Sequence, residues 1–120
     1  TGNFAGSLKE FDPDMIFIAV KFNYLDSLLE DIKPIHRPGQ KLVVVQNGID
    51  NENKVAEKFN LEDVLRFVIN YAGMTMEPGI VRISFFNPPN YIGVVSSKSE
   101  PLAKEVADLI TNAGLETAFV

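Results

Sequence analysis

Three short apolar runs constrain the fold of this chain more than any other feature of the sequence. They are Met15 to Val20, Leu42 to Gln46 and Val64 to Ile69. Each run is short for a helix and lacks the regular alternation of a strand that has one face in water. Strands of this kind are covered on both faces, as in a parallel sheet between two layers of helices. The runs therefore predict an α/β fold with three layers.

The segments between these runs have the spacing of helices. After the first run, apolar residues recur at helical spacing from Tyr24 to Ile32, with Asn23 as the expected cap, and Pro34 then stops the pattern. A shorter helix is expected to begin at about Asp50 or Asn51. The residues on its buried face would be Val55, Ala56 and Phe59. The order β-α-β-α-β favours right-handed crossovers between parallel strands.

The second half of the chain has a different pattern. The segments Ile80 to Phe86 and Tyr91 to Val95 are separated by Asn87-Pro88-Pro89-Asn90, which predicts an antiparallel hairpin between them. A helix capped by Ser99 should follow, and Gly114 should end it. The expected apolar stripe of this helix is Leu102, Ala103, Val106, Leu109 and Ile110. A last strand is predicted from Thr117 to Val120.

Charge and composition exclude several classes of partner. The net charge is −5, and the 11 Lys and Arg residues form no basic cluster, so a nucleic-acid partner is not expected. No apolar stretch approaches the ~18 residues of a membrane span, so we expect no membrane partner. The chain has no cysteine and one histidine, which argues against a metal site or a catalytic triad and fits a cytoplasmic location. His36 is expected to face solvent in a loop.

Candidate binding residues follow from the predicted sheet, because ligands bind at the carboxyl ends of parallel strands in folds of this class. The residues that follow the three runs are Lys21, Asn47 and Asn70. A lysine offers a cation to a phosphate or carboxylate, and an amide bonds hydroxyl groups. The alternatives are a solvated lysine and a structural Asn47-Gly48 turn. No residue is assigned a catalytic role.

A motif that a dinucleotide-binding fold normally carries is not present. The pattern G-x-G-x-x-G holds the pyrophosphate after the first strand of such a fold, and none of the eight glycines of this chain forms it. Two interpretations follow. Either the chain does not bind a dinucleotide, or the first β-α-β unit of the fold lies outside it.

Several segments read in series resemble the ketopantoate reductase family. The order and spacing of the segments match that family over nearly the whole chain. The two most specific pieces fit D-x-x-x-x-A-V-K and Q-N-G. The segments are Asp14 to Lys21, Val44 to Ile49, Pro78 to Val81 and Tyr91 to Gly93.

The resemblance implies that residues 1–120 form one partial Rossmann-like NADP-binding domain. Its glycine-rich first half would precede Thr1, and an all-helical C-terminal domain would follow Val120. The family passes a hydride from NADPH to 2-dehydropantoate, a 2-keto acid, and yields pantoate for coenzyme A synthesis. By motif match, Lys21 and Asn47 would contact both cofactor and substrate. The family's general acid is a lysine of the helical domain and has no counterpart in this chain.

These implications lead to three expectations for the chain by itself. It should show no reductase turnover and at most very weak NADPH binding, because the reaction needs a closed cleft between two domains. The outer edge of Met15 to Val20 should be open, so the chain either forms a homodimer along it or covers it with residues from Asn3 to Ser7.

Two alternatives to a 2-dehydropantoate 2-reductase remain. They are a reductase paralogue for another 2-keto acid and a non-catalytic α/β binding or regulatory domain.

Overall fold

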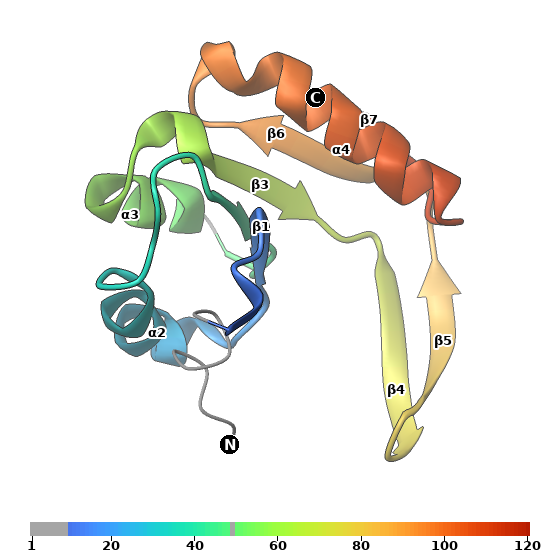
Figure 1. Cartoon of the computed structure of the whole chain (residues 1–120). Helices are drawn as coiled ribbons and strands as arrows, with labels where there is room; N and C mark the ends of the chain where they lie inside the picture. Colours follow the sequence, from blue (N-terminus) through green and yellow to red (C-terminus); the bar gives the residue numbers. More distant parts are fainter. Residues whose placement is uncertain (1–9, 49) are drawn as a thin grey trace.

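The computed structural model describes residues 10–48 and 50–120, and its centre is a sheet of five strands (Figure 1). The strand order is β1-β2-β3-β6-β7. β1, β2 and β3 are parallel, β6 is antiparallel to β3, and β7 is parallel to β6. The strands are β1 (Met15–Ile18), β2 (Lys41–Val44), β3 (Val64–Val68), β6 (Asn90–Val94) and β7 (Thr117–Phe119).

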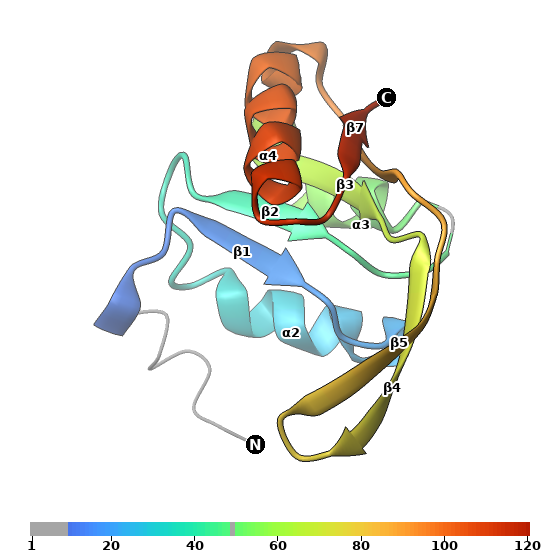
Figure 2. The ribbon, with the colours of Figure 1, turned by 90° about the vertical axis from the view of Figure 1, so that its right-hand side faces the viewer.

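Helices cover both faces of this sheet, which confirms the three-layer α/β fold (Figure 2). Helices α2 (Leu25–Ile32) and α3 (Asn51–Lys58) pack on one face, and α4 (Glu100–Asn112) packs on the other. Alternate residues of β2 show why the apolar run is continuous. Leu42 and Val44 lie in the core under α2 and α3, whereas Val43 lies in the core under α4.

The predicted hairpin between Ile80 to Phe86 and Tyr91 to Val95 is wrong. β5 (Ile80–Phe86) pairs instead with β4 (Tyr71–Glu77), and the turn between them lies at Pro78-Gly79. Gly79 has a φ of 84°, which the turn requires and most side chains disfavour. We call β4 and β5 together the ribbon. It forms a separate two-stranded sheet that projects from the body of the domain (Figure 1).

The segment that suggested a hairpin turn is the junction between the ribbon and the main sheet. Asn90 is fully buried there, and its Oδ1 accepts a hydrogen bond of 2.8 Å from the backbone N–H of Asn70. The Asn70 side chain in turn donates to the Pro89 carbonyl at 2.7 Å. The backbone N–H of Asn87 donates to the Asn70 carbonyl. These bonds fix the bend through which both chains of the ribbon leave the sheet.

Three smaller expectations also differ from the structure. Asn23 does not cap α2, because it lies inside a short 3-10 turn, Phe22–Tyr24, that precedes the helix. Ser99 precedes α4 as expected, but its hydroxyl donates to the Glu62 carbonyl and does not cap the helix. Leu109 is exposed, since α4 buries the narrower stripe of Ala103, Val106 and Ala107.

His36 is half-buried and does not simply face solvent. Its Nε2 donates a hydrogen bond of 2.7 Å to the Gln40 carbonyl, and its ring packs against Phe59 with centroids 4.9 Å apart. The histidine therefore holds the loop before β2 against the residue that ends α3.

β1 lies at the outer edge of the sheet, as the sequence predicts. Its Asp14 and Ile18 carbonyls accept hydrogen bonds from Lys41 and Val45 on the β2 side. Because hydrogen-bonding directions alternate along a strand, the backbone groups of Met15 and Phe17 point to the open side. Asn3 to Ser7, which were expected to shield this edge, fall outside the residues that the structure describes.

None of the helices in residues 10–48 and 50–120 has the length and hydrophobicity that a membrane span needs.

The junction generates a first prediction. Replacing Asn90 with alanine removes the acceptor of the Asn70 backbone N–H in a buried position, which should lower the free energy of unfolding by about 1–3 kcal/mol. Asn87→Ala is the matched control, because only the backbone of the exposed Asn87 takes part in the junction. Urea unfolding of both variants measures the difference. Equal stability of the two variants would contradict this account of the bend.

Candidate functional site

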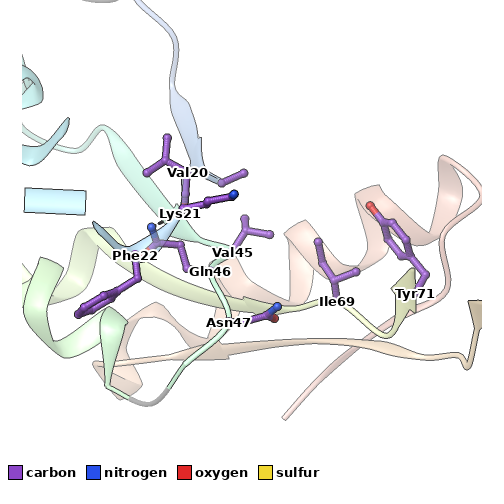
Figure 3. Close-up of a pocket in the computed structure, with 9 residues that line it drawn as sticks. Val20, Lys21, Phe22, Val45, Gln46, Asn47, Ile69 and Tyr71 are labelled. Atoms are coloured by element: carbon purple, nitrogen blue, oxygen red, sulfur yellow. Dashed lines mark hydrogen bonds between the residues drawn. The ribbon is translucent and has the colours of Figure 1, made fainter. Parts of the chain in front are cut away.

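A cleft of about 510 Å³ opens at the carboxyl ends of β1, β2 and β3. The side chains come from the segments that leave these three strands (Figure 3). In that view Val45 and Ile69 lie between Lys21 on one side and Tyr71 on the other. The cleft is lined by Ala19, Val20, Lys21, Phe22, Val45, Gln46, Asn47, Ile69 and Tyr71.

Parallel pairing explains why Lys21 and Asn47 meet at this cleft. Ile18 of β1 lies level with Val44 of β2, so both strands end at the same rim of the sheet and each polar residue follows three positions later. Both residues are exposed, and neither side chain has a hydrogen-bond or ion-pair partner within the described part of the chain. The structure thus brings together two of the three residues that the sequence selected.

Gln46 locks the two strand ends to each other. It is only 5% exposed, and its Nε2 donates a 2.5 Å hydrogen bond to the Val20 carbonyl. The carbonyl can only accept, so the amide nitrogen must face Val20 and the amide oxygen must face away from it. That oxygen is buried and has no hydrogen-bond partner in the described residues. Sequence reasoning missed Gln46, although a glutamine at the end of an apolar run was a visible signal.

The loop after Asn47 is held from two sides. The Asn51 side chain donates to the Asn47 carbonyl at 3.0 Å, and Arg66 of β3 donates to the Gly48 carbonyl at 3.1 Å. Gly48 has a φ of 124°, in a region that favours glycine. The backbone of Asn47-Gly48 therefore has the structural role that the sequence allowed. The Asn47 side chain remains available to the cleft.

Asn70, the third candidate, does not line the cleft, because its side chain holds the Pro89 carbonyl at the junction. Its neighbour Tyr71 lines the cleft instead, and its ring packs against Phe86 of the ribbon in a T-shaped arrangement. Phe22, which sequence reasoning missed, lines the cleft as well. The Lys54 ammonium lies 4.8 Å from the centre of its ring. Phe22 follows the end of β1 by four positions, and Tyr71 follows the end of β3 by three. This position after a parallel strand was the signal in the sequence that could have identified both as cleft residues.

The lining of the cleft combines one cation, an amide and apolar surface, a set of groups suited to binding. Lys21 is the one charged side chain among its nine lining residues and gives it a positive character. Asn47 adds an amide that both donates and accepts, and Val45 and Ile69 offer apolar surface to a flat ring. Among the described residues no group of three or more His, Asp or Glu could hold a metal ion.

Two basic residues with raised pKa values, Arg37 and Lys98, lie at the opposite rim of the sheet. Hydrogen bonds from Arg37 to Asp12, at 2.7 Å, and to Asp14 raise the pKa of Arg37. A hydrogen bond to Glu62 raises the pKa of Lys98. Since Asp14 precedes β1 and Glu62 precedes β3, these pairs surround the amino ends of the strands. They keep both cations charged and do not act on the cleft.

A second cleft of about 430 Å³ lies beside α3, over β3, β6 and β7. It is mostly apolar and includes Val68, Tyr91 and Val120. Its two charged residues, Arg66 and Glu52, face each other with 3.6 Å between Nη1 and Oε2. Because the charges offset each other, this cleft offers little to an anionic ligand.

Comparison with known proteins assigns the chain to a family. The family model "Ketopantoate reductase PanE/ApbA" matches residues 3–97. The chain belongs to the ketopantoate reductase family. Its members are oxidoreductases, and the match confirms the resemblance that the motifs around Lys21 and Asn47 indicated.

Individual relatives agree with this assignment. The chain is 29% identical over 110 residues to a 2-dehydropantoate 2-reductase of Aquifex aeolicus (strain VF5), a match that covers 91% of this chain and 36% of the relative. The chain thus spans about a third of the length of that relative.

Solved structures share the fold. D-mandelate dehydrogenase with NADH and anilino(oxo)acetate gives a TM-score of 0.78 at 22% identity, over 90% of this chain and 35% of the other. A 2-dehydropantoate 2-reductase from Geobacter metallireducens GS-15 gives 0.74 at 22% identity, over 89% and 35%. A dimeric ketopantoate reductase from Staphylococcus aureus gives 0.62 at 18% identity, over 89% and 34%.

The Q-N-G loop of this chain generates a second prediction. A Cβ added at Gly48 would come within 2.9 Å of Asn51 Nδ2 and would break its bond to Asn47. Gly48→Ala should therefore cost about 1 kcal/mol more than backbone strain alone, the value of one hydrogen bond. Gly39→Ala is the control, since Gly39 has a φ of 85° and open space around it. Urea unfolding compares the two, and equal losses would contradict the role given to Asn51.

Proposed function

We propose that this chain is the second half of the nucleotide-binding domain of an NADPH-dependent 2-dehydropantoate 2-reductase. The cleft at the carboxyl ends of β1 to β3 would hold the nicotinamide end of the cofactor next to a 2-keto acid. The observation that carries the proposal is the meeting of Lys21 and Asn47 at one rim, with Gln46 fixing the distance between their strands. Family membership supports the reaction type.

The residues of the cleft fit these ligands. Lys21 would attract the carboxylate of the keto acid or a phosphate of the cofactor, since its ammonium has no competing anion among the described residues. The Asn47 amide would orient the ketone or the nicotinamide carboxamide. Val45 and Ile69 would support the flat ring, because apolar surface with a few polar groups is typical of cofactor sites. The bound NADPH would supply the hydride.

We further propose that the chain is inactive by itself. The developing alkoxide needs a proton donor, and the family resemblance assigns that role to a lysine of a helical domain, whereas Lys21 of this cleft is assigned to binding. Hydride transfer also needs a cleft closed from water, whereas this cleft has walls only from the strand ends and the ribbon. A complete reductase would supply the other wall and the proton donor.

The cysteine-free composition supports a cytoplasmic location.

A second candidate is a reductase for another 2-keto acid. A structural relative was solved with NADH and anilino(oxo)acetate, so the fold is compatible with NADH and with a different ligand. The cleft residues bind features that such acids share, namely a carboxylate and a ketone. Parallel titrations with NADPH and NADH therefore belong to the same experiment. A non-catalytic binding domain would respond to neither cofactor.

Cofactor binding is a third prediction. In an NMR titration of the labelled chain, NADPH should shift the amide signals of Lys21, Asn47 and Tyr71 without saturation in the micromolar range. Lys21→Met should abolish the shifts, because it removes the charge of the cleft and keeps the length of the side chain. Lys33→Met is the matched control, since Lys33 is an exposed lysine at the far end of α2.

Two outcomes would contradict the proposal. Shifts confined to Val68, Tyr91 and Val120 would place the ligand in the second cleft. Equal responses of the Lys21 and Lys33 variants would show that Lys21 does not contribute. Micromolar saturation would refute only the expected weakness of binding.

The open edge of β1 generates a fourth prediction. We propose that a second copy of the chain pairs along it or that residues 3–7 cover it, and the dimeric relative supports a homodimer. Either arrangement should slow hydrogen exchange at the outward amides of Met15 and Phe17. Protection that rises with protein concentration would indicate pairing, whereas constant protection would indicate shielding. Fast exchange of both amides at every concentration would rule out both arrangements.

A further inference from the structure

The ribbon exposes more apolar surface than a water-facing hairpin normally does. Every residue of β5 is exposed, and so are all residues of β4 except Tyr71. An isolated two-stranded hairpin is marginally stable in water and needs a packing partner. A contiguous patch of this kind marks an interaction site. Its large exposed apolar residues are Met74, Met76, Ile80, Val81, Ile83, Phe85 and Phe86.

The pairing register divides these residues between two faces. Met74 pairs with Arg82, and Glu77 pairs with Ile80. Ile80 and Arg82 lie two positions apart in β5, so alternation along that strand puts these two pairs on one face. We call it the Glu77/Arg82 face. The other face carries Val81 and Ile83, which close over Gly73. On the Glu77/Arg82 face Met74 and Ile80 are 62% and 51% exposed, so each has more than half of its surface available to a partner.

The Glu77/Arg82 face carries one acid and one base, placed diagonally across the ribbon. Neither Glu77 nor Arg82 forms an ion pair within the part of the chain that the structure describes. Two copies can be packed face to face about a two-fold axis that lies in the plane of the interface and passes midway between Glu77 and Arg82. Glu77 of each copy would then lie opposite Arg82 of the other copy. The same axis passes close to Ile80 and Met74. Each of these would then meet its own copy.

We propose that the ribbon is a self-association surface, and that two copies of this chain pack their Glu77/Arg82 faces across a two-fold axis with the ribbons crossed. Crossed packing of two-stranded sheets is an established arrangement, and its core here is apolar. The two ion pairs at the rim make the face complementary to itself, which is why a second copy fits it. This contact is separate from pairing along β1, which lies at the other end of the strand order.

Cysteine cross-linking tests the contact directly, because the chain has no native cysteine. Ile80→Cys should form a disulfide-linked dimer under mild oxidation with oxidised glutathione, since the two sulfur atoms would meet near the axis. Ile83→Cys is the matched control, with 53% exposure on the opposite face, and should stay monomeric on a non-reducing gel. A dimer that used only the β1 edge would cross-link neither variant.

Charge reversal in the Ile80→Cys background tests the complementarity. Glu77→Arg or Arg82→Glu should each lower the yield of cross-linked dimer about tenfold, because two attractive pairs become repulsive. The double variant, Glu77→Arg with Arg82→Glu, should restore it. Circular dichroism checks that each variant keeps the native fold.

The expected result is efficient cross-linking at Ile80 only, lost in each single reversal and recovered in the double one. Equal yields of cross-linked dimer from the Ile80→Cys and Ile83→Cys variants would overturn the proposal, because they would indicate non-specific hydrophobic association of the ribbons. No cross-linking at either position would overturn it as well, and would show that some other partner covers the ribbon. Failure of the double reversal to restore dimers would exclude the crossed arrangement.

Discussion

The parallel pairing of β1 with β2 is the constraint on which the rest of this structure depends. It sets two strand ends level, so that residues 26 positions apart in the chain, Lys21 and Asn47, face one cleft. The hydrogen bond from Gln46 to the Val20 carbonyl fixes this arrangement beyond the last ladder bond of the strands. A register slip of one residue would turn every side chain of β1 to the other face and would expose Ile16 and Ile18. The buried core under α2 and α3 thus maintains the geometry of the candidate binding site.

The sequence predicted the elements that depend on local pattern. Buried parallel strands have to be apolar on both faces, so the runs before Lys21, Asn47 and Asn70 were recognisable in isolation. The shared rim followed from topology alone, without any knowledge of side-chain contacts. The clearest errors concern residues whose partners are remote in the chain. Asn70 looked like a site residue, but its side chain is used at the junction with Pro89. Gln46 was overlooked because its function depends on the register between two strands.

The hairpin error has a similar cause. Asn87-Pro88-Pro89-Asn90 carries strong turn signals, and the segments around it are apolar. The turn signals do not decide which strands pair. β6, which follows this segment, pairs with β3, and β5, which precedes it, pairs with β4. Gly73 and Thr75 also hid β4, because they interrupt its apolar pattern. The buried side chain of Asn90 completes the bend, and no rule based on one sequence would assign it that role.

The described chain consists of a sheet that helices cover on both faces and a ribbon that they do not cover. The five-stranded sheet has a helix layer on each face, whereas the ribbon has neither face covered by the described residues. We therefore expect the ribbon to open locally at lower free energy than the sheet, because it has few buried apolar contacts. Tyr71 links the two parts, since it begins β4 and lines the cleft. A partner on the ribbon would thus act next to the proposed cofactor cleft.

The central claim is that the rim shared by Lys21 and Asn47 holds the nicotinamide ring. The most direct measurement is a set of intermolecular NOEs from the nicotinamide ring protons of NADPH to the labelled chain. The account predicts NOEs to the methyl groups of Val45 and Ile69 and to the side-chain amide of Asn47. NOEs instead to Val68, Tyr91 and Val120, in the second cleft, would contradict it.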